Sequence, residues 1–136
     1  MNIKERLNKH NYNKKQLEHI KLEIEKVKRE YQGVTGVAIG SAGGKGTNKI
    51  SSRTESEALR KLEELRKLED KAFDYEIQIK QIENALGVLT EKERITIEIV
   101  YFQNKNLFAV VDEIGGSYRN VLRIHKVALE KLESIL

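Results

Sequence analysis

The sequence predicts an all-α protein in which a long, coiled-coil-like helical hairpin precedes a compact C-terminal helical unit. Three observations predict this fold class. The 136 residues include no proline, which permits uninterrupted helices. Apolar residues recur every three or four positions in several stretches, which is the period of one buried helix face. Six of the nine glycines fall within residues 33–53, which separates the two arms of the expected hairpin.

The composition favours exposed helices over a compact enzyme interior. Apolar residues make up 39% of the chain and charged residues 34%, and tryptophan is absent. The absence of cysteine excludes disulfides and thiolate metal sites. No apolar run of roughly 20 residues is present, and the charged start does not lead into the apolar segment of a signal peptide. We therefore expect a cytoplasmic protein without a membrane partner.

The first arm of the hairpin is expected to contain a short helix over about residues 3–9 and a longer one over about residues 14–31. The polar stretch 11–13 interrupts them, and Gly33 ends the longer helix. The apolar positions of the longer helix alternate in steps of three and four, and they are Leu17, Ile20, Ile24, Val27 and Tyr31. Such a seam predicts packing against a partner helix.

A Gly-rich loop is expected over residues 33–53, with a brief extended segment at 34–39. Within it, residues 40–47 (GSAGGKGT) invite comparison with a phosphate-binding P-loop. The P-loop motif needs four residues between its first glycine and its Gly-Lys pair, followed by serine or threonine. This chain has three residues there, and Gly46 follows the lysine. The spacing therefore does not support nucleotide hydrolysis.

The second arm is expected to be one helix over residues 54–86, with Thr54 and Glu57 as a capping box and Gly87 as its end. Its apolar stripe again alternates three and four, and it comprises Leu65, Leu68, Ala72, Tyr75, Ile79, Ile82 and Leu86. The regular seam indicates packing rather than a cofactor site. Because this helix is longer than its partner, its surplus stripe is expected to pack on the C-terminal helices or on another subunit.

The C-terminal unit, residues 88–136, is expected to contain three helices. Thr90 and Glu93 form a capping box for the first, and the second covers residues 107–114. Two glycines and Ser117 then open a long final helix. This order of helix, short helix, tight turn and long helix is typical of a helix-turn-helix unit.

The final helix has two chemically different faces. The buried face is expected to carry Val121, Ile124, Ala128 and Leu132, and the opposite face Arg119, Arg123 and Lys126. No acid lies between Ser117 and Val127. Arginine makes forked contacts to guanine edges or phosphates, and Asn120 has the matching chemistry for adenine. A solvated charged face is the plain alternative.

This region carries a resemblance to a known family. The segments that carry it are Leu89–Arg94, Val100–Phe102, Val110–Ile114, Ser117, Val121–His125 and Ala128–Leu132. They resemble the region 4 helix-turn-helix of sigma factors. More closely, they resemble the C-terminal half of the RinA/ArpU-type late-gene transcription regulators of phages that infect Gram-positive bacteria. The likeness extends to a lysine-rich helical start, a variable Gly/Ser loop and the segment Ser52–Glu55. Two positions depart from the sigma-like pattern: Ala109 replaces a usual glutamate, and Gly116 a usual hydrophobic residue.

The resemblance implies a sigma-region-4-like helix-turn-helix that binds double-stranded promoter DNA and activates late genes of a phage or prophage. Host RNA polymerase is a further expected partner, and a homo-oligomer is expected, with a dimer favoured. Ser117 would cap the final helix and meet phosphate; Arg119 and Asn120 would meet base edges. Arg123 and Lys126 would meet bases or backbone, and Tyr118 a phosphate or a thymine methyl group. His125 is expected either beside a phosphate, or packed within the fold or solvated.

We expect no enzyme, cofactor or metal. The three histidines lie on different segments without a metal-ligand spacing, and no nucleophile, base and orienting group form a set. Two other functions remain open from the sequence. One is a non-enzymatic interaction module that binds host RNA polymerase or another protein, and the other is a small packaging subunit that binds DNA as a ring.

Overall fold

The structure is a computed structural model that describes residues 2–40 and 48–136, with side chains over 2–33 and 53–136. The described residues form six α-helices and one π-helical segment, with no strand among them. The all-α prediction is therefore confirmed for this part of the chain. The residues pack as two units, one formed by residues 1–15 and 76–136 and the other by residues 16–75. The expected domain boundary after residue 87 stays a prediction.

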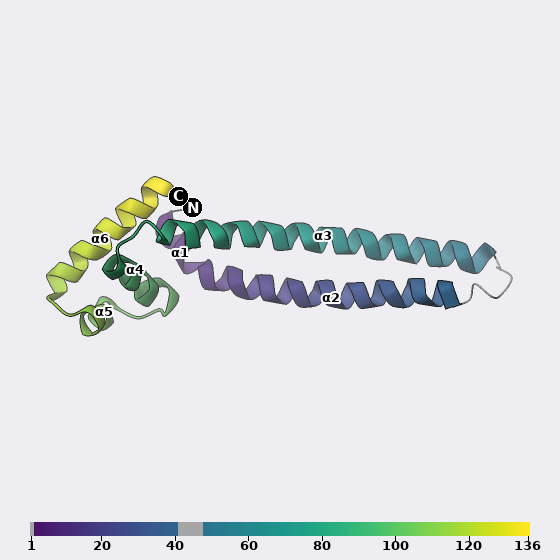
Figure 1. The fold of residues 1–136 in the computed structure, drawn as a ribbon, viewed down its shortest axis with the longest axis horizontal. Coiled ribbons are helices and arrows are strands. Elements are labelled where there is room, and N and C mark those ends of the chain that lie inside the picture. Colours follow the sequence, from purple (N-terminus) through teal and green to yellow (C-terminus); the bar gives the residue numbers. More distant parts are fainter. Residues whose placement is uncertain (1, 41–47) are drawn as a thin grey trace. The chain divides into compact units, whose positions relative to one another are not determined.

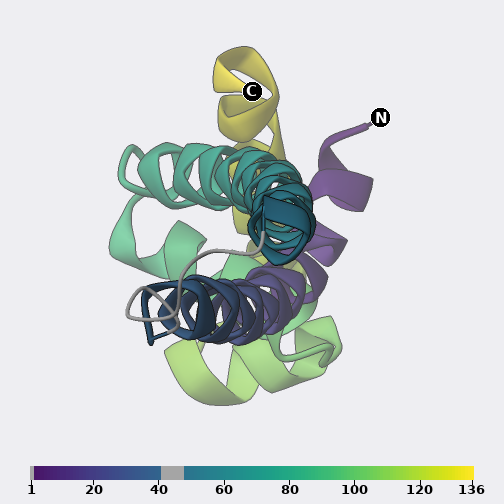
Figure 2. The same ribbon diagram turned by 90° about the vertical axis from the view of Figure 1, so that its right-hand side faces the viewer.

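In the unit of residues 16–75, helices α2 (His10–Gly40) and α3 (Asn48–Leu86) run alongside each other (Figures 1 and 2). The predicted seam positions are the sheltered ones. Ile20 and Val27 are buried. The half-buried members of the seams are Leu17, Ile24, Tyr31, Leu65, Leu68, Ala72 and Tyr75. Lys61 of α3 also donates a hydrogen bond to the Glu30 carboxylate of α2. Both seams thus pack within the chain, as their spacing predicts.

Several predicted helix ends are wrong. Helix α2 begins at His10 and continues through Gly33 to Gly40, so residues 34–39 are helical rather than extended. Helix α3 begins at Asn48, so Thr54 lies inside the helix and does not cap it. Glycine inside a helix costs only roughly 0.5–1 kcal/mol relative to alanine, so it does not stop a helix that lacks proline. Of the predicted Gly-rich loop, residues 41–47, which include most of the P-loop-like segment, lie outside the described residues.

The other unit contains α1 (Ile3–Asn8), α4 (Glu91–Ile97), the π-helical segment η2 (Glu98–Phe102), α5 (Leu107–Ile114) and α6 (Tyr118–Ile135). The end of α3 packs among them, as predicted for its surplus apolar stripe. The main core cluster comprises Leu7, Ile82, Ala85, Leu86, Ile97, Tyr101, Ala128 and Leu132. A second cluster of Ile99, Val110 and Val121 lies between η2, α5 and α6.

Side-chain oxygens fix the start of each short helix in this unit. Asn2 accepts from the Glu5 backbone N–H, Thr90 accepts from Glu93 N–H, and Asn106 accepts from Ala109 N–H. Each bond satisfies an amide that has no partner inside its helix. Helix α5 therefore spans the predicted residues 107–114. The Glu93 side chain does not complete the predicted capping box, because its carboxylate instead accepts from Lys131 Nζ of α6 at 2.8 Å.

The segment η2 links the two apolar clusters. Its wider π-helical turn was not predicted; it places Tyr101 in the main cluster and Ile99 in the second. Asn104 follows with a positive φ of 55°, a conformation that asparagine tolerates better than most residues. This widened turn and the Asn104 bend end the first C-terminal helix, and Asn106 then opens α5.

Candidate nucleic-acid interface

A tight glycine turn leads into α6. Gly115 and Gly116 have φ values of 77° and 88°, which a residue with a Cβ adopts only with strain. Ser117 then takes an extended conformation, and its Oγ accepts a hydrogen bond from Asn120 N–H at 3.1 Å. The predicted Ser117 cap is thus present. The turn allows α5 and α6 to follow each other with only three residues between them.

The inner face of α6 holds the helix in place. Val121, Ala128 and Leu132 are fully buried, as the spacing predicts, whereas Ile124 is only half-buried. Val121 packs with Val110 of α5 and Ile99 of η2. Leu132 and Ala128 pack in the main cluster. Because these contacts occupy one side of α6, the opposite side faces solvent.

The outer face of α6 presents the predicted cations. Arg119, Arg123 and Lys126 are exposed, and none of them forms an ion pair within the described chain. Asn120 is half-buried, and its Oδ1 accepts a hydrogen bond from Arg123 Nη2 at 2.6 Å. The arrangement brings Asn120 and Arg123 together and leaves positive charge uncompensated. Such a face attracts phosphate and can donate hydrogen bonds to base edges.

An aromatic pair lies beside these cations. The Tyr118 ring, at the start of α6, stacks on the Phe108 ring of α5, with ring centroids 4.7 Å apart and planes 19° from parallel. Phe108 is 62% exposed and Tyr118 is 40% exposed. Phe108 was not predicted as part of the site, because only the apolar stripe of α5 was expected to matter. Its aromatic side chain lies outside this stripe, and that position could have indicated an exposed ring.

His125 belongs to the packing of the unit. Its Nε2 lies 2.9 Å from the Tyr101 hydroxyl, and the two rings stack with centroids 5.7 Å apart. Burial raises the pKa of the Tyr101 hydroxyl, which shares this hydrogen bond with the imidazole. Burial, and secondarily the charge of Lys4, lowers the pKa of His125. Of the two roles that the sequence left open, the structure therefore supports the packed histidine.

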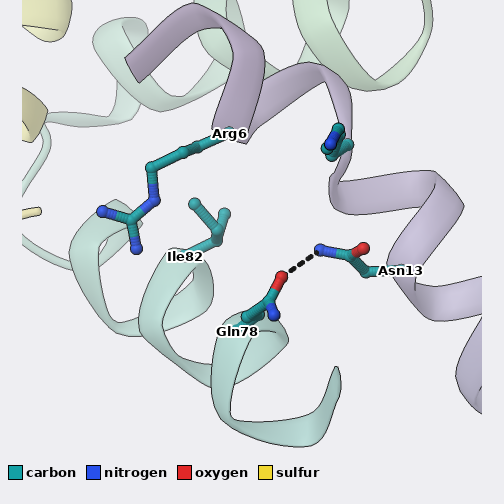
Figure 3. Close-up of a pocket in the computed structure, with 5 residues that line it drawn as sticks. Arg6, Asn13, Gln78 and Ile82 are labelled. Atoms are coloured by element: carbon teal, nitrogen blue, oxygen red, sulfur yellow. Dashed lines mark hydrogen bonds between the residues drawn. The ribbon is translucent and has the colours of Figure 1, made fainter. Parts of the chain in front are cut away.

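A separate hollow of about 370 Å³ lies between α1, the start of α2 and the end of α3 (Figure 3). Its lining residues are Arg6, Lys9, Asn13, Gln78 and Ile82. Asn13 donates to Gln78 at 3.1 Å across it. The guanidinium of Arg6 is engaged by the Leu136 carbonyl and by Gln81. This lining contains no pair of nucleophile and base, so the hollow gives no support for catalysis.

The described residues contain no group of three or more histidine, aspartate or glutamate side chains placed to hold a metal ion. Among the same residues, no helix is both long and apolar enough to cross a membrane. Comparisons with protein-family models, with curated proteins and with solved structures find no match to this chain.

Proposed function

We propose that this protein is a sequence-specific DNA-binding transcription regulator. In this proposal α2 and α3 form the predicted helical hairpin, and α4 to α6 form a sigma-region-4-like helix-turn-helix. Helix α6 would enter the major groove with the side that carries Arg119, Arg123 and Lys126. The observation that carries the proposal is the exposed group of Arg119, Arg123 and Lys126, in a stretch without acids between Ser117 and Val127 that directly follows a capped tight turn.

The chemistry of the face supports base recognition as well as phosphate contact. Forked arginine donors fit the O6 and N7 atoms of guanine, and an asparagine amide fits N6 and N7 of adenine. Ser117 and the first amides of α6 suit a phosphate, because helix N-termini carry partial positive charge. Lys126 lies farther along the helix, where it would contact the backbone, and Tyr118 lies in the first turn. Activation of phage late genes is the more specific role that the sequence resemblance supports.

Variants of the face test this proposal against duplex DNA enriched by repeated selection from random sequences. Arg119→Ala and Arg123→Ala should each weaken binding to the selected duplex by roughly tenfold or more, since a forked base contact is worth about 1–3 kcal/mol. Arg60→Ala, which removes an exposed cation from α3, is the matched control and should bind like the parent. Parent-like binding by both arginine variants would reject the proposal.

A protein-binding role is the second candidate, and one observation favours it. Phe108 and Tyr118 are exposed together on the unit, and Leu122 of α6 is exposed as well. Exposed apolar groups of this kind suit a protein partner, and host RNA polymerase is the partner that the resemblance implies. Salt separates the two candidates. The affinity for DNA falls steeply as the salt concentration rises, because phosphate contacts are screened. The affinity for a protein that docks on apolar side chains changes little with salt.

A further inference from the structure

Helix α3 carries a second apolar face within residues 53–75. Leu59 is 67% exposed, Leu62 is 42% exposed and Phe73 is 61% exposed. Leu62 lies three residues after Leu59, and Phe73 lies 11 residues after Leu62, which is close to three turns at about 3.6 residues per turn. The three side chains therefore share one side of α3. This side differs from the seam of Leu65 and Leu68, which packs within the chain.

Charged residues of both signs lie between the apolar ones on the same side. Arg66 follows Leu62 by one turn, and Glu69 and Asp70 precede Phe73 by one turn. All three are exposed, and within the described residues none of them forms an ion pair. From Leu62 to Phe73, this face thus runs in the order apolar, positive, negative, apolar.

Two copies of this face are complementary when their helices run in opposite directions. If a second α3 runs antiparallel, the register that places Leu62 opposite Phe73 of the second copy also places Arg66 opposite Glu69. Both pairs are centred on the same point of the helix, between residues 67 and 68. A two-fold axis at that point would repeat each contact, which is how a symmetric dimer interface is built. A parallel register would instead oppose like charges, which is unfavourable.

We propose that the face of α3 formed by Leu62, Arg66, Glu69 and Phe73 joins two copies of this chain in an antiparallel homodimer. The apolar side chains at its two ends would be buried from solvent. The two Arg66–Glu69 pairs between them would fix the register of the two helices. The proposal names the surface behind the expected homo-oligomer. It does not depend on the proposed DNA contact, because it concerns a different helix and a different test.

A charge-swap experiment tests the pairing. The parent should sediment as a dimer of a 15.7 kDa chain. Arg66→Glu and Glu69→Arg should each weaken dimerisation by roughly tenfold or more, because each opposes like charges across the interface. An equimolar mixture of the two variants should dimerise again, since one copy then supplies only acids and the other only arginines. A parent that stays monomeric, or variants that dimerise like the parent, would overturn the proposal.

Disulfide trapping tests the register, because the chain has no cysteine of its own. The double variant Leu62→Cys with Phe73→Cys should form a covalent dimer on oxidation. The two positions in one helix are about 16 Å apart at 1.5 Å per residue, too far for a bond within one chain. Each single-cysteine variant should stay uncrosslinked, as should Leu22→Cys combined with Phe73→Cys. Efficient crosslinking of either single variant would show a different register and would contradict the antiparallel pairing. Unchanged helical circular dichroism would show that the variants fold.

Discussion

Arg123 donates a hydrogen bond to the carboxamide oxygen of Asn120 over 2.6 Å, so the two side chains form one pair on the exposed side of α6. The bond uses one of the five guanidinium N–H groups and one of the two lone pairs on the Asn120 oxygen. The other donors remain available to a ligand. Because the pair is already ordered, less side-chain entropy would be lost when both residues meet a base edge.

Replacing the guanidinium while keeping its charge should separate base recognition from phosphate attraction. Arg123→Lys should lose about 1–3 kcal/mol of preference for the selected duplex over a shuffled one, because lysine lacks the fork. Its salt dependence should stay that of the parent. Lys126→Ala is the complementary change. It should weaken binding to both duplexes equally and reduce the slope of log affinity against log salt concentration by about one. Fluorescence anisotropy measures both quantities, and an Arg123→Lys variant that keeps full preference would contradict the assigned role.

Stability should fall in mild acid because the buried His10 and the half-buried His125 resist protonation. Burial lowers the pKa of His10 and of His125 below the ordinary value of 6.5. The unfolded chain therefore binds protons more readily than the folded one once the pH drops below about 6.5. The free energy of unfolding should be pH-independent with respect to these groups above that value and should decrease as the pH falls below it. Urea unfolding at about pH 7.5 and 5.5 would show the loss. His125→Asn should reduce this dependence, and an undiminished loss of stability in that variant would contradict the assignment.

The glycine turn should depend on its left-handed backbone. Gly116→Ala should destabilise the fold by roughly 1–2 kcal/mol, because φ is 88° and alanine is strained there. Gly33→Ala is the matched control within α2, where an added Cβ meets nothing within 4 Å. It should stabilise the helix by roughly 0.5–1 kcal/mol. Thermal unfolding of the two variants should therefore shift in opposite directions, and a shift in the same direction would argue against the described turn.

The inner face of α6 should be essential to the unit. Leu132 is fully buried in the main cluster, so Leu132→Ala should cost about 2–5 kcal/mol of stability by leaving a cavity. Leu22 is 65% exposed on α2, and Leu22→Ala should change stability by no more than about 0.5 kcal/mol. Chemical denaturation compares them directly. Equal effects of the two substitutions would be inconsistent with the packing of α6.

Local signals in the sequence predicted two helix starts of the C-terminal unit. Thr90 and Ser117 lie at helix starts because their side chains satisfy nearby amides, and such bonds involve only neighbouring residues. The apolar seams were likewise visible, since their period fixes which side of a helix packs. The predicted outer face of α6 rests on the same periodicity, and the structure leaves its cations exposed.

Features that depend on distant or weak effects were not predicted. Gly33 and Thr54 suggested helix ends, yet α2 and α3 pass through them because a single unfavourable residue costs little in a long helix. The π-helical turn at Glu98–Phe102 and the Phe108–Tyr118 stack depend on how η2, α5 and α6 pack, which no local pattern encodes. Glu93 similarly bonds Lys131, which is 38 residues away, rather than its own helix start.

The affinity of the unmodified protein for the selected duplex and for a shuffled duplex of the same composition tests sequence-specific DNA binding itself. Fluorescence anisotropy at about 50 and 200 mM salt gives both affinities and their salt dependence. We expect tight, salt-sensitive binding to the selected duplex and clearly weaker binding to the shuffled one. Absence of binding, or equally weak binding to both, would contradict this expectation and would leave the cationic side of α6 as a solvated helix surface.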